Sequence, residues 1–356
     1  MTAPPRTPRV RRFGVGLYTG QKAGGADYAD AAPLAVAAEE AGFDSFWVTE
    51  HHGLPDGYLP SPLVLAAALS SVTSRIALGT GVLLAPLHHP VRLAEDAAVV
   101  DRLSGGRLLL GLGIGYAEHE YRAFGVDPAT RGARLDALLA ALRDAWTGEP
   151  FDSPGLGLAG VRITPTPTGH LPIWIGGYAP RAVRRAGLLA DGHLVGKGER
   201  HIVTAASEQL AQVRDPADPG FTRAVNVTCV LDTDDGGGTA ARRAFAGQQR
   251  VYERMQAGRE VYAGLVPDPE GAGSTGGDGL TAGGIDRHIQ ASGDPDQVTA
   301  TLLTLLDDLA AWADVHLVLR FLFPDPDLDA QLRRVRAFGE QVLPALRTHH
   351  APEVHP

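Results

Sequence analysis

The residues best suited to proton-transfer chemistry stand together at the end of an apolar run, Trp47–Thr49, in the order Glu50, His51 and His52. An imidazole is the side chain most able to donate or accept a proton near neutral pH, and a neighbouring carboxylate can fix its tautomer and orientation. We therefore take Glu50, His51 and His52 as candidate catalytic residues. The local sequence leaves a second interpretation open, in which a loop histidine is hydrogen-bonded to backbone. A metal site is disfavoured because adjacent residues of an extended chain point to opposite sides.

Three glycine-rich segments end other apolar runs. Gly79–Val82 permits an unusual backbone arrangement close to a ligand, although a simple turn is the alternative. Gly111–Tyr116 fails the dinucleotide pattern G-x-G-x-x-G, because its third glycine comes one residue early. Gly176 and Gly177 lead from a strand into a helix, where bare backbone N–H groups beside a helix N-terminus bind an anion. A strand-to-helix turn also uses glycine for steric reasons alone, so this pair has two interpretations.

Such strand ends need a fold that brings them together. Short apolar runs alternate with longer Ala/Leu/Arg-rich helical patterns, which is typical of an α/β fold with βαβ units. Strands are predicted at Phe13–Tyr18, Phe43–Thr49, Ile76–Leu84, Arg107–Ile114, Leu171–Ile175, His193–Val195, Arg223–Leu231 and Val315–Phe321. Helices are predicted at Ala32–Ala41, Ser61–Val72, Val91–Leu103, Arg131–Trp146, Pro180–Ala190 and Asp294–Leu309. We predict a (β/α)8 TIM barrel with insertions, in which chemistry occurs at the C-terminal ends of the strands.

Length favours one large domain, because 356 residues exceed the ~250 typical of such a barrel but stay within its range with insertions. We expect a flexible, Pro- and Arg-rich N-terminal arm at residues 1–12, a single barrel domain at 13–345 and a C-terminal tail at 346–356. Residues 258–284 are rich in Gly, Asp, Pro and Thr, with little that could pack. This composition predicts a mobile surface loop or lid within the domain.

Composition excludes several classes of partner. The net charge of −9, from 41 acidic against 32 basic residues, would repel a phosphate backbone, and no basic stripe compensates. A lone cysteine, Cys229, excludes an intrachain disulfide. The chain has no apolar run of membrane-spanning length and no signal-like segment near its start. We therefore expect a cytoplasmic protein that binds neither nucleic acid nor membrane.

The order and spacing of these segments resemble the bacterial luciferase-like family, which includes luciferase subunits, flavin-dependent monooxygenases and reductases that use the deazaflavin coenzyme F-420. The resemblance spans roughly Phe13 to Pro344, whereas residues 258–284 match nothing. It is carried by Ala41–Asp44 with Trp47 and Glu50–His52, Arg75–Val82, His89–Arg92 with Glu95 and Asp96, Asp101–Arg107, Phe124–Val126, Pro172–Gly177 and His316–Arg320. It implies a (β/α)8 barrel, an isoalloxazine or deazaflavin ring at the C-terminal mouth, and commonly a homodimer.

The resemblance also implies roles for the ring-side residues. His51 falls on the catalytic histidine that acts as an acid or base beside the flavin. In the F-420 branch, that histidine and the preceding acid, here Glu50, lie beside the deazaflavin. Gly81 and Val82 fall on a non-prolyl cis peptide that supports the back of the ring. Gly53 replaces an aromatic residue common after Glu-His-His and leaves extra room near the substrate.

For the rest of the cofactor, Gly113 and Gly115 lie where the family's backbone passes it, and Gly176 and Gly177 fall on the phosphate-binding turn. Arg131 matches an arginine that reaches the phosphate. Two departures concern the phosphate contacts. Ile114 occupies the position of a second phosphate-binding arginine in the luciferase alpha subunit, and Tyr178–Ala179 replaces an acid and a serine.

Three functions follow from the resemblance. The first is a monooxygenase that oxidises a small organic substrate with reduced FMN and molecular oxygen. Because no nicotinamide-binding motif is visible, a separate flavin reductase is expected to supply the reduced FMN. The second is a hydride-transferring reductase or dehydrogenase that uses coenzyme F-420. Only two lysines accompany many arginines, which hints at a GC-rich genome of the kind in which that coenzyme is common. The third is a non-catalytic flavin-binding accessory subunit, against which the retained Glu50, His51 and His52 argue.

Overall fold

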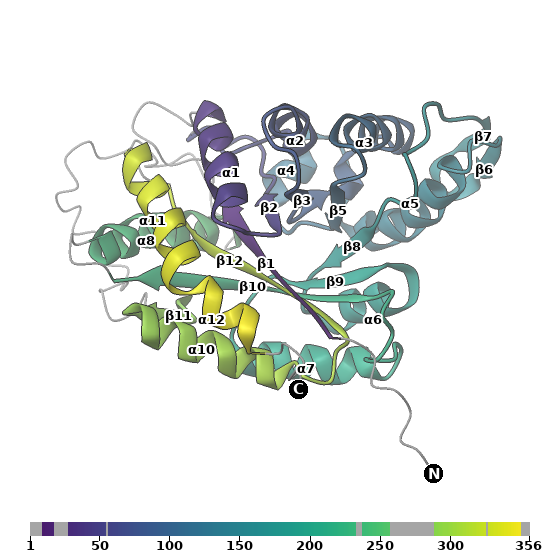
Figure 1. Ribbon diagram of the computed structural model, residues 1–356. Coiled ribbons are helices and arrows are strands. Elements are labelled where there is room, and N and C mark those ends of the chain that lie inside the picture. Colours follow the sequence, from purple (N-terminus) through teal and green to yellow (C-terminus); the bar gives the residue numbers. More distant parts are fainter. Residues whose placement is uncertain are drawn as a thin grey trace, which may run out of the picture.

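Eight parallel strands close into a barrel in the computed structural model, which describes residues 9–17, 28–54, 56–232, 237–256, 288–324 and 327–349 (Figure 1). Around the barrel each strand pairs with the next, and β12 pairs with β1 to close the ring. The predicted (β/α)8 barrel is thus confirmed, and each predicted strand overlaps a barrel strand. In ring order these are β1 (Val10–Leu17), β2 (Ser45–Val48), β3 (Ala77–Thr80), β5 (Leu108–Gly113), β8 (Ile173–Gly176), β9 (Gly192–Val195), β10 (Thr222–Leu231) and β12 (Asp314–Leu322).

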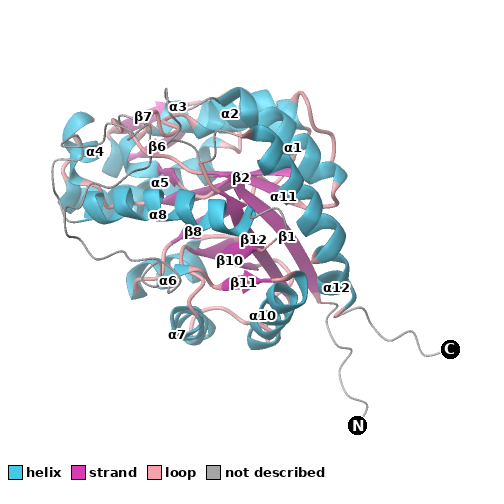
Figure 2. Cartoon of the chain, turned by 90° about the vertical axis from the view of Figure 1, so that its left-hand side faces the viewer, coloured by secondary structure: helices cyan, strands magenta, loops and turns pink. Residues whose placement is uncertain are grey.

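Helices surround this barrel, as Figure 2 shows in a view towards the carboxyl ends of the strands. The apolar strands are buried by this outer layer; all ten residues of β10, for example, are buried. None of the described helices is long and apolar enough to cross a membrane. The helices are α1 (Ala31–Glu40), α2 (Pro62–Ser70), α3 (Pro90–Ser104), α4 (Glu118–Ala123), α5 (Arg131–Ala145), α6 (Pro180–Leu189), α7 (Arg200–Ala211), α8 (Gly237–Gln256), α10 (Pro295–Asp308), α11 (Leu328–Gln341) and α12 (Leu343–Thr348).

Several boundaries differ from the sequence prediction. Strand β1 begins at Val10, so residues 10–12 pair with β12 rather than belonging to a solvated arm. Residues 346–348, expected in the tail, complete α12, where the Leu346 side chain is buried. The single strand predicted over Ile76–Leu84 is two strands, β3 and β4 (Leu83–Leu84), because a cis peptide bond joins Gly81 to Val82 between them. Residues 258–284 lie outside the described residues.

Additions to the barrel were missed by the periodicity analysis. An antiparallel hairpin, β6 (Phe151–Ser153) and β7 (Leu158–Val161), follows α5, and β11 (Ala291–Gly293) extends the sheet beside β10. Helices α4, α7, α8, α11 and α12 were also not predicted. Helix α8 matters most for function, since it crosses in front of the barrel mouth in Figure 2.

Two tryptophans fill the barrel interior below the mouth. The rings of Trp47 and Trp174 lie 5.1 Å apart, and both are almost fully buried. A Cβ at Gly79 would lie 2.3 Å from the Trp47 ring, and one at Gly192 would lie 2.7 Å from that of Trp174. Glycine in these strands therefore makes room for the indoles, which form a solid floor beneath the strand ends.

Candidate functional site

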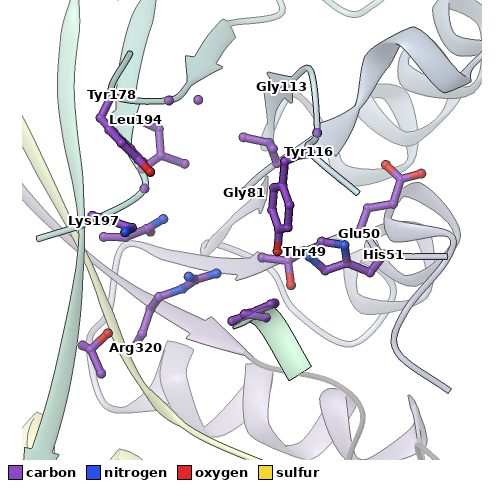
Figure 3. Close-up of a pocket in the computed structure, with 18 of the residues that line it drawn as sticks. Thr49, Glu50, His51, Gly81, Gly113, Tyr116, Tyr178, Leu194, Lys197 and Arg320 are labelled. Carbon is purple, nitrogen blue, oxygen red and sulfur yellow. The ribbon is translucent and has the colours of Figure 1, made fainter. Parts of the chain in front are cut away.

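A cavity of about 440 Å³ lies at the C-terminal ends of the barrel strands, and part of its lining is drawn in Figure 3. Strand ends from around the barrel form its walls, and α8 contributes Phe245, Gln249, Tyr252 and Glu253. The fold thus brings together residues that are far apart in the sequence. The predicted site residues that line it are Glu50, His51, Gly81, Val82, Gly113, Gly115, Gly176 and Gly177.

His51 lies at the edge of this cavity, and its imidazole is hydrogen-bonded to a residue outside the cavity lining. Its Nδ1 is 2.9 Å from Oε1 of Glu120, a fully buried residue of α4. The same oxygen accepts a hydrogen bond from the His52 amide at 2.9 Å. With Glu120 as a carboxylate, Nδ1 must donate, so Nε2 is the nitrogen left for chemistry. This arrangement supports the interpretation of His51 as an acid or base over that of a backbone-bonded loop histidine.

Replacing Glu120 with Gln should reduce turnover roughly tenfold to a hundredfold, by analogy with the loss seen when a carboxylate that orients a functional histidine is removed. The amide keeps the shape of the side chain but can present its NH2 group to His51, which removes the preference for one tautomer. KM for the substrate should change less than kcat, because Glu120 does not line the cavity. Steady-state kinetics of Glu120→Gln check this, and a change confined to KM would contradict the positioning role.

Glu50 lines the cavity, but both of its carboxylate oxygens are already engaged. Oε1 lies 2.7 Å from Nε2 of His52 and 2.9 Å from Nε2 of His88, and Oε2 accepts from the Leu84 amide at 2.5 Å. Burial by itself would raise the pKa of Glu50, but these hydrogen bonds and the charge of His88 outweigh it and lower the pKa to about 2. An ionised, fully bonded carboxylate suits anchoring the end of β2 better than transferring a proton.

Two predicted residues do not line the cavity. His52 points away from it, since its Nε2 bonds Glu50 and its ring packs at 4.6 Å from that of Phe124. Arg131 begins α5 and is half-buried outside the cavity lining. The residue-by-residue match that assigned Arg131 to the phosphate is therefore not supported by contact with the cavity.

The glycines near the predicted ring site surround one side chain, that of Val82. A Cβ at Gly113 would lie 2.5 Å from Val82 Cγ2, and one at Gly176 would lie 2.3 Å from Val82 Cγ1. The cis peptide bond between Gly81 and Val82, predicted from the resemblance, is present. It sets the Val82 isopropyl group between β5 and β8. The resulting wall is apolar and free of projecting side chains at Gly113 and Gly176, which suits the face of a planar ring system.

The predicted phosphate turn is present, but one of its amides is already used. The Gly177 amide donates to the Leu194 carbonyl at 3.0 Å, so it is not bare. At the start of α6, Pro180 has no amide hydrogen and the Ala182 amide donates to the Ala179 carbonyl at 2.8 Å. Anion binding at this turn would therefore use the remaining amides beside the helix N-terminus, which Ala179 leaves without a side-chain cap. Gly177 has φ +138°, and a Cβ there would lie 2.9 Å from Ala182. Glycine thus lets the chain turn tightly onto an uncapped helix N-terminus.

His193 supports this turn from inside the protein. Its Nε2 lies 2.7 Å from the Gly177 carbonyl oxygen and must donate to it, so Nδ1 accepts from Arg223 at 3.0 Å. Both ring nitrogens are satisfied only when the imidazole is neutral. Burial, together with the charge of Arg223, lowers the pKa of His193 to about 3.

Stability should consequently fall as the solution becomes acidic. The folded-state pKa of His193 lies below its ordinary value of 6.5, so the stabilisation is complete above pH 6.5 and is lost as the pH falls towards 3. The loss approaches about 1.4 kcal/mol of unfolding free energy per pH unit for this one histidine. Urea unfolding at pH 7, 6 and 5 should give a shallower pH dependence for His193→Gln than for the wild type. Identical slopes would contradict this assignment.

Sequence reasoning missed the tyrosines around His51. The His51 ring contacts those of Tyr58, Tyr116 and Tyr252 at centroid distances of 4.9, 5.7 and 5.6 Å. The hydroxyls of Tyr58 and Tyr252 lie 2.9 Å apart. Tyr116 alone carried a local signal, since it directly follows the glycine-rich end of a predicted strand. Tyr252 lies on α8, 201 positions beyond His51, and no local pattern connects the two.

Two cations in the lining were also missed as site residues. Lys197 follows β9, and Arg320 lies near the end of β12. In Figure 3 they lie on the side of the cavity opposite His51. Among the described residues there is no group of three or more His, Cys, Asp or Glu side chains that could hold a metal ion.

These features fit a phosphorylated flavin-type cofactor. The apolar Val82 wall suits a ring, the uncapped start of α6 suits a phosphate, and both face one cavity. The residues that would hold the group are Gly81, Val82, Gly113, Gly176 and Gly177 with the first turn of α6. FMN and coenzyme F-420 share a tricyclic ring and a phosphate, so the fit applies to both.

Comparisons with known proteins agree with a cavity that fits a flavin-type cofactor. A family model described as luciferase-like monooxygenase matches residues 11–311. The F420-dependent glucose-6-phosphate dehydrogenase of Nakamurella multipartita is 30% identical over 352 residues, covering 96% of this chain and 98% of that protein. The 4-hydroxyprotoasukamycin monooxygenase of Streptomyces nodosus subsp. asukaensis is 29% identical over 308 residues, covering 79% and 80%. The crystal structure of a monooxygenase from Streptomyces bottropensis has a TM-score of 0.73 at 23% identity, covering 94% of this chain and 99% of that one, which is a likeness of fold.

Proposed function

Since this chain belongs to the luciferase-like monooxygenase family, an oxidoreductase family with both FMN-dependent and F-420-dependent members, we propose that it is a monooxygenase that uses reduced FMN and molecular oxygen to oxidise a small organic substrate. The observation that carries the proposal is the His51–Glu120 pair, 2.9 Å apart, at the edge of a cavity that also contains the apolar Val82 wall. Reduced FMN, when bound, supplies the electrons that activate oxygen.

The chain's own residues bind the cofactor, orient it and move a proton. Val82 and the adjoining glycines support the ring, and the start of α6 holds the phosphate. His51 holds a proton at Nε2, delivers it to the reacting oxygen and recovers it from the substrate, while Glu120 keeps Nδ1 as the donor. Tyr58, Tyr116 and Tyr252 crowd this end of the cavity and limit the access of water, which protects an oxygen-activating reaction from wasteful side reactions.

A hydride-transferring dehydrogenase that uses coenzyme F-420 is the second candidate. It is favoured by the 30% identity to the F420-dependent glucose-6-phosphate dehydrogenase along almost the entire chain. In such a reaction His51 would take the substrate's proton as the hydride leaves, and oxygen would play no part. The same side chains serve both candidates, so the identity of the bound cofactor distinguishes them.

Anaerobic titration separates the two candidates. The purified protein is titrated with reduced FMN and, separately, with oxidised and reduced F-420, and binding is followed by absorption and fluorescence. The monooxygenase proposal expects micromolar binding of reduced FMN and at least tenfold weaker binding of F-420. The opposite preference would replace it with the dehydrogenase. A protein that binds neither would remove both.

The source of reduced FMN forms part of the proposal. The glycine-rich segment at Gly111–Tyr116 lacks the dinucleotide-binding pattern, and in the structure it forms the end of β5 and the adjoining cavity wall. We therefore propose that a separate reductase supplies reduced FMN to this chain, and, from the family resemblance, that the chain forms a homodimer. Oxygen uptake should then require an added NADH-dependent flavin reductase, and uptake with NADH and FMN alone would contradict this part.

A further inference from the structure

The cavity has a second chemical character on the side away from the predicted cofactor wall. The ends of β3, β5 and β8 provide the Val82 wall and the phosphate turn. The ends of β9, β10 and β12 instead present two cations, Lys197 and Arg320, with the neutral polar side chains of Asn226 and Thr228 between them on β10. Figure 3 shows Lys197 and Arg320 on the same side, facing Tyr116 and His51 across the cavity.

The barrel backbone fixes the position of Arg320. It is the partly exposed residue of β12, lies between buried Leu319 and Phe321, and is in register with Thr228 of β10. On the other side, in β1, Gly16 leaves room for it, because a Cβ there would lie 2.8 Å from Arg320 Cγ. Because its strand belongs to a closed sheet, the Arg320 side chain loses little further conformational entropy when it binds a ligand. Its planar fork can bind both oxygens of a carboxylate at once.

Lys197 approaches the same region from the loop after β9. Its Nζ lies 5.4 Å from the centre of the Tyr178 ring, and it forms no ion pair with any described residue. Glu199 is the one acidic side chain of this loop that faces the cavity. Glu50 and Glu253 also line the cavity, so three acidic side chains accompany Lys197 and Arg320 in its described lining. A doubly charged anion would meet repulsion from these carboxylates, whereas the two cations suffice for an anion with one negative charge.

The space between the cations and His51 is bounded by rings. Tyr116 and Tyr252 pack around His51, and Phe245 of α8 lines the same cavity. Such walls bury an apolar or aromatic body, whose transfer from water is favourable by about 25 cal/mol per Å². A substrate anchored at Arg320 would thus place its body against the aromatic side chains and its far end near His51.

We propose that Lys197 and Arg320 form a carboxylate-binding subsite, so that the substrate is a singly charged carboxylic acid with an apolar or aromatic body. The proposal rests on the proposed function only for the statement that this cavity holds the substrate. Neither residue was assigned a role by sequence, and both are specificity-determining residues rather than parts of the proton-transferring pair.

Binding of matched small probes tests the subsite without any turnover. Phenylacetate, 2-phenylethanol and 2-phenylethylamine share one body and differ in charge, and calorimetry or ligand-observed NMR gives their affinities for the full chain. The wild type should bind phenylacetate at least about tenfold more tightly than either analogue, since a charge-assisted hydrogen bond contributes about 1.5–3 kcal/mol. Equal affinities, or no measurable phenylacetate binding, overturn the proposal.

Three variants assign the effect to the two cations. Arg320→Gln and Lys197→Gln should each weaken phenylacetate binding about tenfold and leave 2-phenylethanol unchanged. Arg200→Gln is the control, because Arg200 is an exposed arginine paired with Asp308 on the outer surface. Unchanged phenylacetate binding in Arg320→Gln and Lys197→Gln would overturn the subsite. So would competition by inorganic phosphate that is as strong as that by phenylacetate.

Flavin titration of the same variants keeps this proposal separate from the proposed function. Reduced FMN should bind Arg320→Gln and Lys197→Gln within about twofold of the wild type. A tenfold loss of FMN affinity with intact phenylacetate binding would assign the cations to the cofactor and overturn the subsite. Wild-type protein that binds phenylacetate but no reduced FMN would instead remove the proposed function and leave the subsite standing.

Discussion

Replacing His51 with Asn should lower turnover about 100- to 10,000-fold, the range expected when a positioned acid–base group is lost. Asn can still accept a bond at one atom and donate at another, but it cannot exchange a proton near neutral pH. Affinity for reduced FMN should change less than threefold, because the Val82 wall and the start of α6 are untouched. The measurement is kcat under saturating oxygen and reduced flavin, together with the Kd of the flavin.

His89→Asn is the matched control for this substitution. His89 is an exposed residue that precedes α3, and its side chain makes no capping bond there. The same chemical change at this position should leave kcat within about twofold of the wild type. If His51→Asn retained wild-type turnover, the imidazole would have no proton-transfer role in the reaction.

The second large effect is expected at Gly176, where an added methyl group meets Val82. A Cβ at Gly176 would lie 2.3 Å from Val82 Cγ1, so the isopropyl group must move towards the ring site. Overpacking of this kind costs roughly 1–3 kcal/mol, which corresponds to about a 5- to 150-fold loss if it is expressed in cofactor binding. Reduced-FMN titration of Gly176→Ala measures this loss.

A double variant tests whether Val82 transmits the effect. Shortening Val82 to Ala removes the colliding Cγ atoms, so Gly176→Ala with Val82→Ala should recover most of the flavin affinity lost in Gly176→Ala alone. Gly155→Ala is a useful control, since a Cβ there would make an ordinary contact, 3.4 Å from Ala137, far from the cavity lining. Failure of the double variant to recover affinity would show that Gly176 acts through its backbone rather than through space for Val82.

The roles of Glu50 and His52 illustrate the limit of inference from neighbouring residues. The sequence placed Glu50, His51 and His52 together and suggested that the carboxylate orients its adjacent histidine. In the structure Glu50 bonds His52 and His88, whereas His51 is oriented by Glu120, 69 positions away. Successive residues at a strand end point to opposite sides, so the partner of each side chain must come from another element.

The glycine pairs show the opposite case, in which local sequence was informative. Glycine is needed at Gly113 and Gly176 because Val82 fills the space beside them, and such steric needs leave a visible mark at strand ends. The interpretation of Gly177 as a bare phosphate-binding amide was wrong in one respect, because β9 takes that hydrogen bond through Leu194. Bonding between neighbouring strands depends on register, which no single strand reveals.

The Glu50–His51–His52 segment, together with the alternation of apolar runs and helical patterns, was enough to predict the barrel, which the structure confirms, and to propose the C-terminal strand ends as the site and His51 as its acid–base residue. These properties are encoded locally, in periodicity, glycine positions and residue type. Only the tertiary structure decided that Glu120 holds His51, that α8 brings Tyr252 to the cavity and that Lys197 and Arg320 face His51 across it. Closing the barrel sets these pairs, because it joins residues whose separation along the chain is too long for any local pattern to record.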